Sequence, residues 1–142
     1  MTTEHGYYFE DLEVGMGDSY TRTVTAEDIQ VFADVSGDIN PAHLNDEFAA
    51  NSRFKQRIAH GMLTGSYIST IIGTRLPGPG CLYLNQSMKF RNPVFVNDKV
   101  TATATITRLD ARRKFVTFET ICRVGDQQVI TGEALIWVPS KQ

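Results

Sequence analysis

The feature that most constrains the fold is a long apolar segment, residues 61–76, which ends abruptly at Pro77-Gly78-Pro79-Gly80. At helical spacing, one face carries Met62, Ser69, Ile72 and Leu76, and a second face carries Leu63, Tyr67, Ile68 and Ile71. A helix that is apolar on two sides is usually buried, and the Pro-Gly pairs stop it. The sequence therefore predicts a fold built around one central helix.

Shorter elements precede this helix. Residues 20–24 are rich in β-branched side chains (Thr21, Thr23 and Val24) and predict a strand. Thr25, followed three positions later by Asp28, predicts the N-terminus of a helix that ends near Ser36-Gly37, where glycine tolerates the left-handed conformation. Residues 38–41 predict a turn, because Asp and Asn bond their own backbone and Pro fixes φ. A second short helix is expected over residues 46–51.

Strands dominate the rest of the chain. Apolar residues and threonines alternate over residues 100–107, and this period of two is typical of a strand that is buried on one face. Similar strands are expected at 82–90, 115–124 and 129–138, with hairpin turns at 112–114 and 125–127. Helices followed by a run of antiparallel strands predict an α+β domain, a curled antiparallel sheet packed around helix 61–76.

Composition narrows the class of protein. The chain has 142 residues, of which 42% are hydrophobic and 21% charged, as expected for one soluble domain over residues 1–142. Its net charge of −2 gives no support for a nucleic-acid partner. No run reaches the ~20 apolar residues of a membrane helix. The polar residues 1–5 do not resemble a signal peptide, so a cytoplasmic location is expected.

The densest cluster of reactive residues is Ser36-Gly37-Asp38-Ile39-Asn40-Pro41-Ala42-His43. Fully extended, five steps could separate Asp38 from His43 by roughly 17 Å, but the Asn40-Pro41 turn folds the chain back. A carboxylate and an imidazole facing one water molecule can transfer protons in an addition to a double bond. On spacing alone, a turn cap and a packed histidine explain the cluster equally well.

A second cluster, Ile58-Ala59-His60-Gly61-Met62, stands directly before the apolar helix. The first turn of a helix has unpaired N–H groups, and its dipole favours negative charge. Gly61 could let a thioester carbonyl approach one of these groups and form an oxyanion site. From the residues alone, a glycine that only eases entry into the helix is the favoured explanation.

These motifs resemble the MaoC-like, or hydratase-2, family. The first cluster resembles the family's characteristic motif, and the resemblance continues in order through residues 59–63, 76–80, 83–87 and 90–94. The short bacterial members of this family are (R)-specific enoyl-CoA hydratases, which supply 3-hydroxyacyl-CoA for polyhydroxyalkanoate synthesis. Ala42 departs from the family's usual Leu, Ile or Val, and this change leaves the chemistry unaltered.

The resemblance implies a hot-dog fold, a long central helix wrapped by an antiparallel sheet, in a homodimer. It implies that Asp38 and His43 are the catalytic pair that holds and activates water. Gly61 matches the residue whose N–H polarises the thioester carbonyl, and Asn40 matches an asparagine that supports the pair. Ser69 and Ile72 match helix positions that line the acyl pocket.

The expected reaction is the syn addition of water to a trans-2-enoyl-CoA, giving (R)-3-hydroxyacyl-CoA. No metal or organic cofactor is expected, because the chemistry needs none and the histidines show no metal-ligand spacing. Three alternatives remain: a hot-dog acyl-CoA thioesterase, a 3-hydroxyacyl-carrier-protein dehydratase and a non-catalytic binding module. Arg112-Arg113-Lys114 is interpreted as a solvated turn that could also meet CoA phosphates across a dimer.

Overall fold

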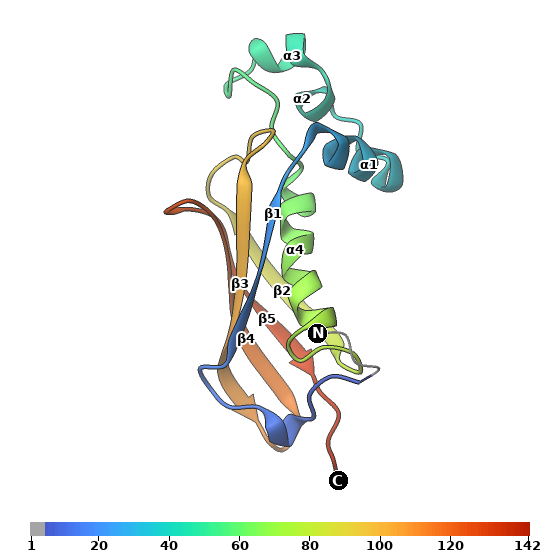
Figure 1. Ribbon diagram of the computed structural model, residues 1–142, viewed down its shortest axis with the longest axis vertical. Coiled ribbons are helices and arrows are strands. Elements are labelled where there is room, and N and C mark those ends of the chain that lie inside the picture. The colour runs from blue at the N-terminus through green and yellow to red at the C-terminus, as the bar shows by residue number, and fades with distance from the viewer. Residues whose placement is uncertain (1–4) are drawn as a thin grey trace.

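The structure is a computed structural model that describes residues 5–142. Residues 1–4, which entered the prediction of location, lie outside the described part of the chain. Figure 1 shows one antiparallel sheet with a long helix, α4, along it, and three short helices beyond the N-terminal end of that helix. The elements in chain order are a 3-10 turn η1 (Phe9–Asp11), β1 (Gly17–Thr23), α1 (Ala26–Ser36), α2 (Pro41–Leu44), α3 (Asp46–Ala50), α4 (Gly61–Thr74), β2 (Leu82–Phe90), β3 (Lys99–Asp110), β4 (Phe115–Val124) and β5 (Gln127–Trp137).

The sheet has five strands in the order β1-β3-β4-β5-β2, and every neighbouring pair is antiparallel. The three central strands follow one another through hairpin turns at residues 111–114 and 125–126. The two edge strands, β1 and β2, stand on either side of the helical segment in the sequence. This arrangement confirms the predicted α+β architecture, in which an antiparallel sheet packs around one apolar helix.

The core lies between α4 and the sheet. Residues of β3 that point toward the helix are fully or almost fully buried: Val100, Ala102, Ala104 and Ile106. From α4 the buried apolar residues are Leu63, Tyr67, Ile68, Ile71 and Ile72. Burying each large aliphatic side chain contributes about 1.5–3 kcal/mol, and the small alanines allow the helix to lie close to β3.

The prediction that α4 is buried on two sides is only partly right. Met62 is 57% exposed, and Ser69 is also exposed, so the face that they share points away from the core. Ile72, assigned to the same face, is buried, and so is Leu76, which lies beyond the end of the helix. The helix ends at Thr74, two residues earlier than predicted.

The segment between β1 and α4 begins with the predicted helix start. Thr25 caps α1 by accepting a hydrogen bond from the Asp28 N–H, and the Asp28 carboxylate accepts one from the Thr25 N–H. Arg22 on β1 forms an ion pair of 2.8 Å with Asp28, which fastens α1 to the sheet. The helix ends at Gly37, whose φ of 79° is left-handed, as the sequence predicted. The chain therefore leaves α1 directly into residue 38.

Within residues 5–142, none of the helices combines the length and the apolar character needed to span a membrane.

Candidate active site

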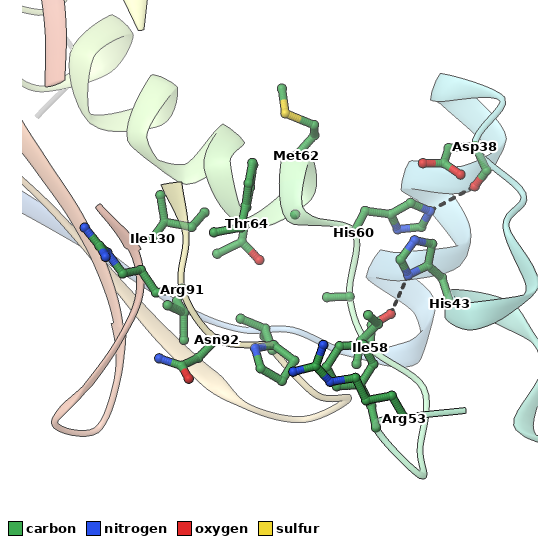
Figure 2. A pocket seen from close by; sticks show the side chains of 17 residues that line it. Asp38, His43, Arg53, Ile58, His60, Met62, Thr64, Arg91, Asn92 and Ile130 are labelled. Carbon is green, nitrogen blue, oxygen red and sulfur yellow. Dashed lines mark hydrogen bonds between the residues drawn. The ribbon is translucent and has the colours of Figure 1, made fainter. Parts of the chain in front are cut away.

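One pocket of about 620 Å³ lies at the N-terminal end of α4. Figure 2 shows that three parts of the chain meet there: the segment from α1 to α2, the segment that enters α4, and the end of β2 with the neighbouring part of β5. Asp38, His43, His60 and Gly61 all line it. The structure therefore brings both clusters found in the sequence to one cavity.

A short helix, rather than a simple turn, places His43. Asn40 is the N-cap of α2, and its Oδ1 accepts a hydrogen bond of 3.0 Å from the Ala42 N–H. Pro41 occupies the first helical position, where its missing N–H costs nothing. The predicted turn over residues 38–41 is thus correct up to Asn40, and Pro41 begins a helix that the sequence analysis did not predict.

The Asp38 carboxylate belongs to the loop just before α2. Its Oδ1 accepts a hydrogen bond of 3.3 Å from the Asn40 N–H, and the Asp38 N–H donates to the Ser36 hydroxyl. Asp38 is exposed and lines the pocket. Nitrogen or carboxylate oxygen atoms of Asp38, His43 and His60 lie within 4.8 Å of one another. The predicted convergence of Asp38 and His43 on one space is therefore confirmed.

The orientation of His43 is fixed by a main-chain carbonyl. Its Nδ1 lies 2.7 Å from the Ile58 oxygen, and because a carbonyl can only accept, we assign the proton to Nδ1. Nε2 is then left with its lone pair and can accept a proton. The ring is 9% exposed, so it is held within the pocket wall with little freedom to turn.

His60 is the residue that the sequence analysis did not single out as functional. Its Nε2 lies 2.9 Å from the Asp38 main-chain oxygen, which makes Nε2 the donor. Its ring lies against that of His43, with centroids 3.9 Å apart and planes inclined by 31° (Figure 2). The side chain is only 2% exposed. His60 therefore contacts both members of the predicted catalytic pair.

Asp38, His43 and His60 are also the residues that could hold a metal ion. Each imidazole donates one N–H to a carbonyl, which leaves His43 Nε2 and His60 Nδ1 with their lone pairs. The same lone pairs and the Asp38 carboxylate can also bind a water molecule, which is the use that a proton-transfer pair requires.

Gly61 begins α4, so its N–H is one of those without an intrahelical partner. A side chain would fit here only if Phe90 moved, because a Cβ atom would lie 2.6 Å from Cε1 and 2.8 Å from Cδ1 of that ring. The positive end of the helix dipole also lies at this point. The position is suited to an oxygen atom that gains negative charge.

Three other predicted site residues lie away from this pocket. Asn40 is exposed and caps α2, Ser69 is exposed on α4, and Ile72 is fully buried in the core. None of the three lines the cavity. The structure shows that Asn40 caps α2. Its support of the catalytic pair stays a prediction, as does the role of Ser69 and Ile72 in an acyl pocket.

The family model of the MaoC like domain matches residues 12–128. An (R)-specific enoyl-CoA hydratase from Rhodospirillum rubrum is 51% identical over 135 residues, which cover 95% of this chain and 94% of the relative.

Two solved structures are similar in fold and sequence. An unliganded R-hydratase from Pseudomonas aeruginosa has a TM-score of 0.90 and 40% identity, with 96% of this chain and 88% of that chain covered. An (R)-hydratase from Aeromonas caviae involved in PHA biosynthesis has a TM-score of 0.89 and 40% identity, with 92% and 99% covered. These matches confirm the predicted hot-dog fold.

Proposed function

The chain belongs to the family of MaoC-like domains, and we propose that it hydrates trans-2-enoyl-CoA to (R)-3-hydroxyacyl-CoA, reversibly. The observation that carries the proposal is the pair formed by the Asp38 carboxylate and the free Nε2 of His43, near the N-terminal end of α4. The relatives named above support the substrate class, because the 51% identical protein is an (R)-specific enoyl-CoA hydratase.

The proposed reaction uses one water molecule. The Asp38 carboxylate accepts a hydrogen bond from the water, and His43 Nε2 removes its other proton as the oxygen attacks C3. The C2–C3 π electrons move toward the thioester, whose oxygen gains negative charge beside the Gly61 N–H. His43 then returns the proton from Nε2 to C2. One C–O and one C–H bond form, while one O–H bond of water and the C2–C3 π bond break. Both new bonds form on the same face, so the addition is syn.

His60 is given a supporting role in this proposal. By donating to the Asp38 carbonyl and lying against His43, it keeps the carboxylate and the imidazole at a fixed separation. No step uses a metal or an organic cofactor. Substrate orientation and proton transfer are the work of side chains and one main-chain N–H.

The test is the loss of enoyl-thioester absorbance with crotonyl-CoA and octenoyl-CoA. We expect rapid hydration to the (R)-alcohol by the wild type, and a loss of at least about 100-fold in kcat for Asp38→Asn and His43→Gln. Asp34→Asn is the matched control, because Asp34 is an exposed carboxylate on α1 that bonds only to Gln30 among the contacts described. It should keep full activity.

Release of free CoA separates the hydratase from its closest alternative. A thioesterase attacks the carbonyl carbon and liberates a thiol, whereas hydration leaves the thioester intact. Thiol release without formation of the 3-hydroxyacyl product would overturn the proposal. Faster turnover of crotonyl-carrier protein than of crotonyl-CoA would instead assign the chain to the carrier-protein dehydratases.

We also propose that two copies of the chain form a homodimer through β2. This edge strand has no buried residue, and it exposes Leu82, Tyr83, Leu84 and Phe90. A long apolar edge of this kind favours pairing with another strand. Light scattering after gel filtration, with Leu84→Lys as the disruptive variant, tests this assembly. We further propose that residues 1–142 form one domain and that the protein is cytoplasmic.

A further inference from the structure

The hydroxyl of Thr64 has a bonding pattern unlike that of the other threonines in α4. Thr70 donates to the Ser66 carbonyl at 3.3 Å, and Thr74 donates to the Thr70 carbonyl at 2.6 Å. Such bonds to the carbonyl four residues earlier are the usual arrangement for a helical threonine. Thr64 has no hydrogen-bond partner within residues 5–142, although its side chain is only 1% exposed.

Crowding of the local acceptor explains part of this difference. The carbonyl four residues before Thr64 is that of His60, and it already accepts from the Leu63 and Thr64 N–H groups, at 3.1 and 3.3 Å. The Thr64 hydroxyl does not bond to this carbonyl. Thr64 lines the pocket, and Figure 2 shows its oxygen pointing from the first turns of α4 into that space.

A buried hydroxyl without a hydrogen-bond partner destabilises the folded protein. Its loss of hydration costs about 1–3 kcal/mol, and most buried polar groups in folded proteins are paired. Valine has nearly the same shape as threonine and would avoid this cost at the same position. The hydroxyl is therefore explained best by a partner that enters the pocket.

The position of Thr64 relative to Gly61 identifies that partner. Residues three apart in a helix share a face, and helical side chains tilt toward the N-terminus. The Thr64 side chain consequently lies over the turn that begins at Gly61, and both residues line the same cavity. A hydroxyl and an N–H that meet in this way can both donate to one oxygen atom.

We propose that the Thr64 hydroxyl donates a hydrogen bond to the thioester carbonyl oxygen of the substrate, beside the Gly61 N–H. This inference rests on the proposed hydratase function and makes Thr64 a catalytic residue. The two donors form one oxyanion site. Their hydrogen bonds strengthen as the carbonyl oxygen gains charge during the attack of water on C3.

The first test compares Thr64→Val with Thr64→Ser. We expect Thr64→Val to lower kcat by about 100-fold, the loss typical of removing one oxyanion donor, with a much smaller change in KM. The melting temperature should stay the same or rise, because an unpaired hydroxyl is removed. Thr64→Ser keeps the hydroxyl and should recover most of the activity.

Thr70→Val is the matched control. It removes a hydroxyl from the same helix, at a position that does not line the pocket. It should leave kcat unchanged. Wild-type kcat in Thr64→Val, together with a higher melting temperature, would overturn the inference and leave the hydratase function standing.

A binding measurement separates failure of this inference from failure of the proposed function. Butyryl-CoA labelled with ¹³C at its carbonyl binds without reacting, and infrared difference spectra report the polarisation of that carbonyl. We expect its stretching frequency to fall on binding to the wild type and to Thr64→Ser, and to fall less with Thr64→Val. Equal shifts in all three proteins would contradict the role of Thr64, whatever the hydration assay shows.

Discussion

His60 lies against His43 with ring centroids 3.9 Å apart, while its Nε2 donates to the main-chain oxygen of Asp38. One buried side chain thus touches the imidazole of the proposed base and the backbone of the carboxylate that faces it. Its two contacts are chemically different, one being a ring surface and the other a hydrogen bond. Substitution can therefore remove them separately.

His60→Gln keeps an N–H donor for Asp38 and removes the ring, whereas His60→Phe keeps a ring against His43 and removes the donor. We expect each to lower kcat for crotonyl-CoA by about tenfold or more, because small displacements of reacting groups are costly. The substrate contacts are left in place, so KM should change little. Steady-state kinetics measure both, with melting curves to establish folding. Wild-type kcat in both variants would show that His43 and Asp38 are held without His60.

Gly61→Ala tests the space at the start of α4. The added Cβ would lie 2.6 Å from the ring of Phe90, which is 55% exposed and lines the pocket. The ring can move, so we expect a small loss of stability but a severalfold rise in KM. Gly73→Ala is the control on the same helix, because a Cβ there meets nothing within 4 Å. It should stabilise the protein by about 0.5–1 kcal/mol without changing KM. An unchanged KM in Gly61→Ala would contradict the proposed approach of substrate at this position.

The ion pair between Arg22 and Asp28 predicts a dependence of stability on pH. Hydrogen bonds from Arg22 hold the pKa of the Asp28 carboxyl below its ordinary value of 3.8. A lowered pKa in the folded state contributes stability above pH 4, and this contribution is lost as pH falls through the folded value. Asp28→Asn should therefore cost up to about 1 kcal/mol at pH 6 and progressively less below pH 4. Urea unfolding of both proteins at a series of pH values measures the difference. A cost that stays constant down to pH 2 would exclude the charge as its source.

The two free cysteines should differ in reactivity from ordinary thiols. Burial raises the pKa of Cys122 to about 12, and burial also raises that of the half-buried Cys81. Thiolates are the reactive form, so we expect Cys122 to resist Ellman's reagent at pH 8 in the folded protein and to react in urea. Cys81→Ser leaves Cys122 as the sole thiol and isolates its rate. Rapid labelling of that variant without denaturant would show that the sheet opens over Cys122.

Removal of divalent metals should leave the activity unchanged. The proton transfers proposed for His43 and Asp38 use their own nitrogen and oxygen atoms, although with His60 they could also ligate a metal ion. Activity is measured before and after treatment with EDTA and gel filtration. A loss that Zn²⁺ restores would instead make these three residues a metal site.

Much of this architecture could be predicted because it depends on neighbouring residues. The alternation in β3, the capping of α1 by Thr25 and the left-handed Gly37 are local patterns, and each is confirmed. Ends of elements were less accurate, as at Thr74, where the backbone turns before the apolar pattern ends. The two-sided burial of α4 could not be judged, because periodicity does not show which side the sheet covers.

The site was predictable to the same extent. Asp38 and His43 are five residues apart, so their turn could be identified from the sequence. His60 bonds to the Asp38 carbonyl across 22 positions, and no local pattern reports that contact. Thr64 could not be predicted for another reason. Its distinguishing property is a buried hydroxyl without a hydrogen-bond partner, and only the three-dimensional structure shows this.

The pairing of β1 with β3 has a consequence for how the chain folds. The hydroxyls of Thr21 and Thr101 meet across 80 positions, whereas β3, β4 and β5 are joined by short turns. Loop closure is entropically cheaper for the local hairpins, so we expect the three-strand meander to form first. All of the proposed catalytic residues lie between β1 and β3 in the sequence, in a long loop that closes only when these two strands pair. Partly folded molecules would contain most of the sheet and no catalytic centre, so turnover would report completion of folding.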